Sequence, residues 1–197
     1  TIERLKLISD GSFEDVLKVV LEDNQPAEFE VIEKHVKAGR LDLKDKLNNM
    51  LAARDLIAIG NNSSIEKSII LTANGWQKYI KIILQLLEEY HLKFPLRIGI
   101  PRAELRQALN LSPKIFNLII DKLESDQIIE DTNKFVLTFG YKPTLTIQQS
   151  ETIDFYLSEL KQKRYSPSSD IKIDDDILVL LENQMIVVRI SESIVYP

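Results

Sequence analysis

The chain has 197 residues, 44% hydrophobic and 28% charged, with 25 basic and 30 acidic side chains, a formal net charge of −5 and no cysteine. This composition is typical of a folded globular protein, and it excludes disulfides, thiolate metal sites and cysteine nucleophiles. No apolar run reaches the roughly 18 residues of a membrane span, and a start at Thr1 without an initiator Met or a secretory signal indicates a cytoplasmic fragment of a longer protein.

The first 75 residues predict three helices followed by a hairpin. Apolar residues recur at helical spacing over Phe13–Leu21, Ala27–Val36 and Asp42–Arg54. Two short apolar runs, Ile57–Ile59 and Ile69–Leu71, follow them and predict a pair of strands.

The middle of the chain has the clearest pattern. The apolar stripe of Trp76–His91 predicts a helix, and Ile100–Pro101 is expected to open a second helix with proline in its first turn. Ser112 is expected to cap a third helix that runs to Leu123, and a hairpin turning at 131–134 follows. Three helices and a two-stranded wing make a winged helix, whose second and third helices form a helix-turn-helix.

The last third of the chain predicts the same order in a reduced form. Glu151–Arg164 is the expected first helix and Asp174–Asn183 the expected third helix. Only a short second helix is expected between them, around Ser166–Ile171, and Ser193–Tyr196 is expected to form the second wing strand.

One unit therefore recurs three times. Leu51, Leu123 and Leu181 each stand at the end of a helical stripe that passes directly into β-branched residues, at spacings of 72 and 58 residues. We predict a mainly α (α+β) fold of three tandem winged-helix domains, over residues 1–75, 76–143 and 144–197. The short linkers Ala73–Gly75 and Tyr141–Thr144 are expected to act as hinges.

The charge of these domains matters because phosphate neutralisation drives binding to nucleic acids. The first domain has 10 basic and 13 acidic residues (−3), the second 10 and 8 (+2), and the third 5 and 9 (−4). Only the middle domain is even slightly basic, so the pattern argues against strong binding of DNA.

The segment from Tyr90 to Arg106 reads YHLKFPLRIGIPRAELR. It resembles the second winged helix of the C-terminal extension of bacterial selenocysteine-specific elongation factors, the SelB family, in which a "YH…P…G…R.EL" segment joins the first two helices. That extension has four winged helices behind a translation-factor body, and this chain is similar to roughly the first three.

The resemblance implies a function. The full factor is a GTPase, using GTP and Mg²⁺, that delivers selenocysteyl-tRNA to the ribosome at a UGA codon. An mRNA hairpin directs it there and is bound by the last two winged helices, chiefly the fourth. The chain has no G-x-x-x-x-G-K-[S/T] motif, so we expect a monomeric, non-catalytic arm, without cofactor or metal, that links the GTPase body to the hairpin-reading domain.

Two groups of residues are candidates for contacts with RNA. In the middle domain they are Arg97, Arg102 and Arg106, the last two being four residues apart and hence on one helix face. In the third domain they are Lys161, Lys163, Arg164, Tyr165 and Lys172, with Arg189 from the wing. The alternative for both groups is a solvated helix face, or cations that complement the C-terminus of a helix.

Structural roles are expected for the remaining residues that could carry chemistry. Asp174–Asp176 are expected to cap a helix rather than to ligate a metal, and His91 is expected to hydrogen-bond the turn into Pro95. The aromatic side chains at helical or strand core positions are expected to pack in the core: Trp76, Phe116, Phe135 and Phe155.

Two functions of other classes stay open. One is a DNA-binding regulator or chromosome-partition protein built from tandem winged helices, which would need outward basic residues on its third helices. The other is a protein–protein scaffold, a role that suits an acidic surface.

Overall fold

The computed structural model describes residues 12–36, 39–60, 64–162, 173–191 and 194–196. The chain divides into two compact units. The first contains the residues up to Gln85 together with Ala103–Ile129, and the second contains Leu86–Arg102 together with the residues from Glu130 onward. The domain boundaries predicted after residues 75 and 143 stay a prediction.

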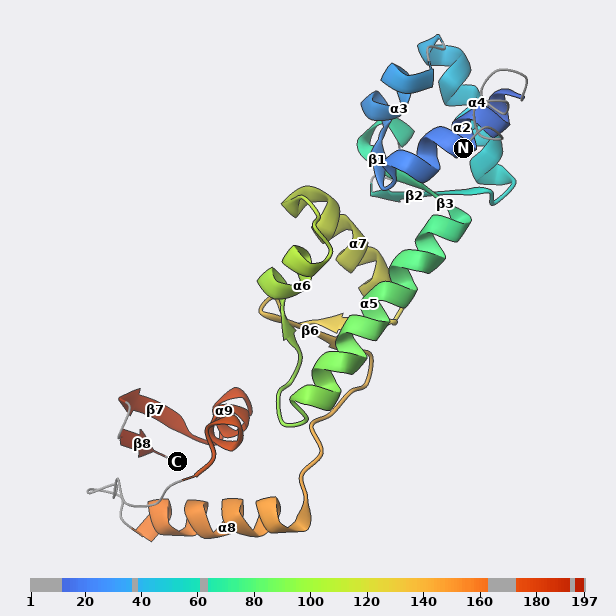
Figure 1. The fold of residues 1–197 in the computed structure, drawn as a ribbon. Helices are drawn as coiled ribbons and strands as arrows, with labels where there is room; N and C mark the ends of the chain where they lie inside the picture. Colours follow the sequence, from blue (N-terminus) through green and yellow to red (C-terminus); the bar gives the residue numbers. More distant parts are fainter. Residues whose placement is uncertain (1–11, 37–38, 61–63, 163–172, 192–193, 197) are drawn as a thin grey trace. The chain divides into compact units, whose positions relative to one another are not determined.

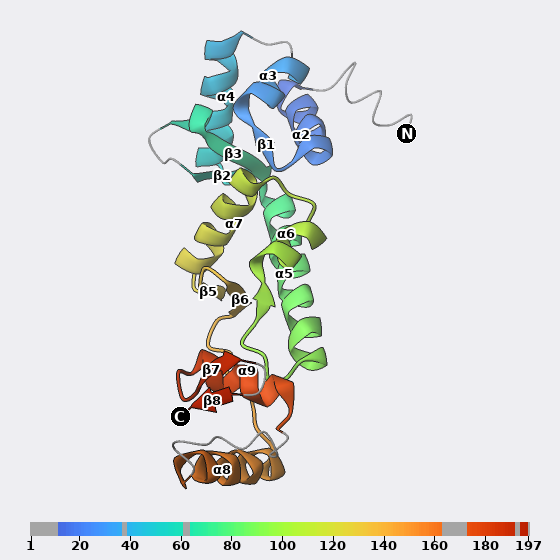
Figure 2. The same ribbon diagram turned by 90° about the vertical axis from the view of Figure 1, so that its left-hand side faces the viewer.

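The first module has the order helix, strand, helix, helix, strand, strand. A capping box at Ser12 starts its first helix, because the hydroxyl accepts the amide of Asp15 while the Asp15 carboxylate accepts the amide of Ser12. The helices lie on one face of an antiparallel sheet in which β3 is central (Figures 1 and 2). The elements are α2 (Phe13–Asn24), β1 (Ala27–Glu28), α3 (Phe29–Val36), α4 (Arg40–Ala52), β2 (Leu56–Gly60), the 3₁₀ turn η1 (Ile65–Lys67) and β3 (Ser68–Thr72).

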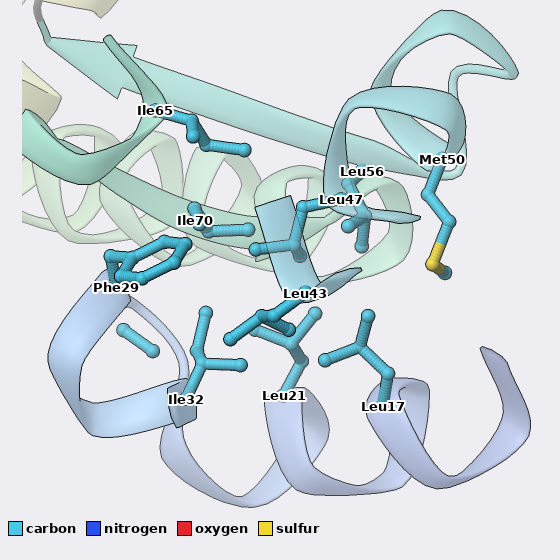
Figure 3. Packing of buried hydrophobic residues seen from close by; sticks show 11 residues of the cluster. Leu17, Leu21, Phe29, Ile32, Leu43, Leu47, Met50, Leu56, Ile65 and Ile70 are labelled. Carbon is cyan, nitrogen blue, oxygen red and sulfur yellow. The ribbon is translucent and has the colours of Figure 1, made fainter. Parts of the chain in front are cut away.

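The core of the first module lies between these helices and the sheet. Figure 3 shows side chains from α2, α3, α4 and the strands converging on one centre. Leu17, Leu21, Phe29 and Leu47 are fully buried there. The helical spacing of these residues in the sequence is therefore the spacing of the buried face.

The middle module repeats the same order of elements, so its winged helix is confirmed. Ser112 caps the third helix as predicted, accepting the amide of Ile115. The elements are α5 (Ala73–Lys93), β4 (Ile100–Pro101), α6 (Arg102–Ala108), α7 (Pro113–Ser125), β5 (Ile129–Asp131) and β6 (Phe135–Thr138), with sheet order β4-β6-β5.

Two short strands were expected to be helical. Ala27–Glu28 pairs with β3, and Ile100–Pro101 pairs with β6, so α3 and α6 each begin after a strand of two residues. Proline has no amide hydrogen to donate to a neighbouring strand, and Pro101 is therefore tolerated in a strand at the edge of the sheet. Helical periodicity does not reveal strands of this length.

The third module has α8 (Ile147–Gln162), α9 (Asp175–Asn183), β7 (Val188–Ser191) and β8 (Ile194–Tyr196). The two helices confirm the first and third helices of the predicted unit, although α8 begins four residues earlier than expected. The short second helix predicted around Ser166–Ile171 lies outside the described residues.

The third helices of all three modules, α4, α7 and α9, end in the same way. Each is followed by a non-glycine residue in the left-handed region: Arg54 (φ 62°), Gln127 (φ 56°) and Met185 (φ 56°). The next amide donates back into the helix: Asp55 to Met50, Ile128 to Leu123 and Ile186 to Leu181, at 3.0, 3.0 and 2.9 Å. This is a Schellman motif. It aligns Leu123 and Leu181 with Met50, so the alignment on Leu51 was wrong by one residue.

The hinge predicted at Ala73–Gly75 was wrong, because these residues form the first turn of α5. The Thr72 hydroxyl accepts the amide of Gly75 at 3.0 Å, as an N-cap residue does. Thr72 in turn donates from its amide (2.9 Å) and its hydroxyl (3.0 Å) to Oε1 of Gln25. The strand therefore passes directly into the helix.

The described residues confirm a mainly α fold with small antiparallel sheets and winged-helix architecture. None of the helices in the described part of the chain is both long and apolar enough to cross a membrane.

Candidate nucleic-acid interface

The third helix of a winged helix is the usual reader of a nucleic acid, and in the middle module that helix, α7, contacts the first module. Lys114 at its start donates to Glu28 of β1 at 2.6 Å. This hydrogen bond and the charge of Glu28 raise the pKa of Lys114. The first outward cation of α7 is therefore paired with a carboxylate of the same unit.

Further along α7, the same face borders strand β2. A groove of about 360 Å³ between the two is lined by Ala58, Ile59, Gly60, Leu118, Asp121, Lys122 and Ser125. A Cβ atom at Gly60 would lie 3.5 Å from Leu118 Cδ2, which is ordinary contact distance. Lys122 is paired with Asp126 at 2.6 Å. Helix α7 therefore packs on protein along the face that a DNA-reading helix would turn to the major groove.

Helix α9 of the third module carries three carboxylates at its start. The Asp174 carboxylate accepts the amide of Asp176 at 2.8 Å, so the predicted capping role of Asp174 is confirmed. Asp176 pairs with Arg97, whose Nε and Nη2 each lie 3.0 Å from the same carboxylate oxygen. Negative charge at the start of α9 complements the helix dipole but repels phosphate.

Two of the three candidate arginines of the middle module are engaged within the chain. Arg97 pairs with Asp176, and its Nη1 donates to the hydroxyl of Tyr90 at 3.4 Å. These interactions, led by the hydrogen bond to Tyr90, raise the pKa of Arg97. Arg102 pairs with Asp131 of the wing, whose side chain is only 6% exposed.

Arg106 is half-buried on α6 and makes no ion pair with another described residue. Arg102 and Arg106 do share a helix, but Arg102 is turned to the wing. Whether these arginines contact RNA stays a prediction, in which Arg106 carries the least compensated charge of the three.

The candidates of the third module are only partly described. Lys161 is exposed in the last turn of α8. Arg189 on β7 pairs with Glu182 of α9 at 2.7 Å. The other four lie outside the described residues: Lys163, Arg164, Tyr165 and Lys172.

The expected packing role of Phe155 was wrong, since its side chain is 60% exposed on α8, whereas Trp76 and Phe116 are buried as predicted. The buried stripe of α8 is Ile153, Tyr156 and Leu160, and Phe155 stands one position off it. The spacing of that stripe was visible in the sequence and could have identified Phe155 as an outward aromatic residue.

The predicted hydrogen bond of His91 to the turn was also wrong. Neither ring nitrogen of His91 has a partner among the described residues, and its ring stacks on Tyr141 at 3.5 Å between centroids. The Tyr141 hydroxyl donates to the carbonyl oxygen of Pro95 at 3.0 Å instead. Burial lowers the pKa of His91.

Residues 84–137 match the family model of the winged helix of elongation factor SelB, the second winged helix of that protein. The matched stretch extends from α5 to β6 and includes the segment from Tyr90 to Arg106 that carries the resemblance. A search of curated protein sequences found no significant match. The family match confirms the predicted relationship for residues 84–137, in the middle of the chain, which are similar to the second winged helix of elongation factor SelB.

Proposed function

We propose that this chain is a non-catalytic arm of a selenocysteine-specific elongation factor. It connects the GTPase body, which holds GTP and Mg²⁺ and carries selenocysteyl-tRNA, to the domain that binds the mRNA hairpin at the UGA codon. The arm works in the cytoplasm as a monomer and needs no cofactor of its own. Its contacts with the ribosome and with RNA are weak and depend on the cations of the third module, of which Lys161 is exposed.

The packing of α7 against the first module is the observation that supports this proposal best. A winged helix that reads DNA needs its third helix free and lined with basic or amide side chains. Here Lys114 is paired with Glu28, and Leu118 and Lys122 border β2. A third helix that contacts a neighbouring module suits a spacer of fixed length better than a domain that binds DNA.

A protein–protein scaffold is the second candidate, favoured by an apolar surface on the third module. Met185, Val188 and Ile190 are 91%, 62% and 68% exposed. Contiguous exposed apolar surface is typical of interaction sites, and these three residues lie within six positions of one another in the sequence.

Fluorescence titration with an RNA hairpin, a tRNA and a DNA duplex, each at two salt concentrations, distinguishes the candidates. The arm predicts weak RNA binding that falls steeply with salt. Tight binding of the duplex would favour a DNA-binding regulator, and no binding of any probe would favour the scaffold.

A pair of matched variants sharpens this titration. Lys161→Gln should weaken RNA binding and lower the salt slope by about one. Lys78→Gln removes a lysine of α5 that is also exposed and should leave both quantities unchanged. An equal effect of the two variants would mean that the third module has no special part in RNA binding.

A further inference from the structure

The segment that joins α5 to β4 contributes to the core of a different module. Leu96 is 6% exposed and packs in a cluster with Ile153 and Tyr156 of α8 and Ile177 of α9. All four residues belong to the second compact unit. A side chain of the middle module thus completes the core of the third.

The neighbouring Arg97 joins the same two modules by polar contacts. Two of its nitrogens donate to one oxygen of Asp176 in the first turn of α9, and a third donates to Tyr90 at the end of α5. Its guanidinium also lies 4.1 Å from the centroid of the Phe94 ring. The guanidinium group is planar, so an arginine that hydrogen-bonds two partners and also stacks on an aromatic ring fixes the orientation of those partners as well as their distance.

The same segment also contacts the chain that leads into α8. Tyr141 donates to the carbonyl oxygen of Pro95 and stacks on His91. The third module is therefore attached on two sides, at α9 through Arg97 and at the approach to α8 through Tyr141.

We propose that Arg97 is a positioning residue, which fixes the direction of α9 relative to the last turns of α5 through its simultaneous contacts with Asp176 and Tyr90. The inference rests on the proposed function, in which α9 belongs to the module that contacts RNA. Arg97 does not touch RNA in this role. It sets the angle at which the third module presents α9, so a displacement of that module by bound RNA is transmitted to α5.

Distance measurements between two spin labels test this directly, because the chain has no cysteine of its own. Glu88→Cys on α5 and Asn183→Cys on α9 introduce exposed labelling sites in the second unit. Pulsed electron resonance on the full chain should give a single narrow distance peak. The narrow peak should be lost in Arg97→Lys, which keeps the positive charge but not the planar guanidinium group, and in Asp176→Asn. It should be retained in Asp176→Glu.

Arg189→Lys is the matched control. It alters the Arg189–Glu182 pair at 2.7 Å, which lies wholly within the third module, and the narrow peak should persist. Circular dichroism of each labelled variant establishes that the third module is folded. A narrow peak in both Arg97→Lys and Asp176→Asn would refute the positioning role, as would equal broadening in Arg189→Lys.

The outcome is independent of the RNA titration. If the chain binds no RNA but the peak behaves as expected, the proposed function fails and the positioning role of Arg97 in the fold stands. If RNA binds and the peak is insensitive to Arg97, the reverse holds.

Discussion

Gly99 has no room for a side chain. A Cβ atom at this position would lie 2.4 Å from the backbone oxygen of Val136 on β6. Backbone atoms of a paired strand cannot move aside as a flexible side chain can. The glycine in the segment that resembles the SelB winged helix is therefore explained by the close approach of the chain to β6.

Gly99→Ala should lower the free energy of unfolding by about 1–3 kcal/mol, the usual cost of overpacking, and should loosen the β4–β6 pairing. Chemical denaturation measures the first effect and amide hydrogen exchange at Val136 the second. Gly39→Ala is the control, because no atom of the described residues lies within 4 Å of the added methyl group. Equal losses in the two variants would contradict the explanation.

The residues in the left-handed conformation after the third helices lead to a prediction of increased rather than decreased stability. Gln127 has φ 56°, a conformation that costs a residue with a Cβ about 1–2 kcal/mol, whereas glycine adopts it freely. Gln127→Gly should therefore raise the free energy of unfolding by about 0.5–1 kcal/mol after the greater entropy of glycine in the unfolded chain is counted.

Ser125→Gly is the matched control for that variant, two residues earlier and at the last position of α7. It should destabilise the protein by up to about 1 kcal/mol, since glycine disfavours a helix. Denaturant midpoints of both variants measure the difference, and the same sign for both would contradict the role of the left-handed conformation.

At the scale of the element, the end of α5 contains a buried imidazole that should make stability depend on pH. Burial lowers the pKa of folded His91 below its ordinary value, so the unfolded chain takes up the proton first as the pH falls. The contribution of His91 is complete above about pH 6.5 and is lost progressively below it. Acidification should therefore loosen the contact between α5 and Tyr141.

His91→Phe keeps a ring to stack on Tyr141 but cannot bind a proton. The fall in the urea midpoint between about pH 7.5 and pH 5.5, either side of the unperturbed histidine pKa, should be smaller in this variant than in the natural chain. His35→Gln changes the other histidine, which is exposed, and serves as control. An unchanged pH dependence in His91→Phe would show that the pKa of His91 is the same in the folded and the unfolded chain.

Element positions could be predicted from the sequence wherever a periodic apolar stripe was long enough. The helices α2, α4, α5, α7 and α9 follow such stripes, and the capping residues Ser112 and Asp174 mark two of their starts. Strands β1 and β4 could not be predicted, because two residues show no period and their pairing with β3 and β6 depends on contacts far along the chain.

Side-chain partners were harder to predict than elements. Arg97 and Arg102 were predicted to be exposed cations. Their carboxylate partners, Asp176 and Asp131, are distant in the sequence and could not be recognised from it. The bond of Tyr141 to Pro95 likewise joins residues 46 apart. The local sequence pattern around an arginine does not show which carboxylate from a distant part of the chain will pair with it in the fold.

At the scale of the whole molecule, the limits of a repeated module need not coincide with the limits of cooperative folding. The repeat in the sequence suggests three separate cores. The structure instead places Leu96, from the segment after α5, among the core residues of the third module. The second unit should therefore unfold as one body that includes Leu86–Arg102.

Leu96→Ala tests this cooperativity. Truncation of a buried leucine costs about 2–5 kcal/mol, and here the loss should appear in the third module, as faster amide hydrogen exchange in α8 and α9. Leu92→Ala is the matched control, four residues earlier in the same segment and 77% exposed. It should change exchange in neither helix. If Leu96→Ala accelerates exchange only within α5 and β4, the third module folds without the segment, and Arg97 would then be holding a module that is otherwise independent.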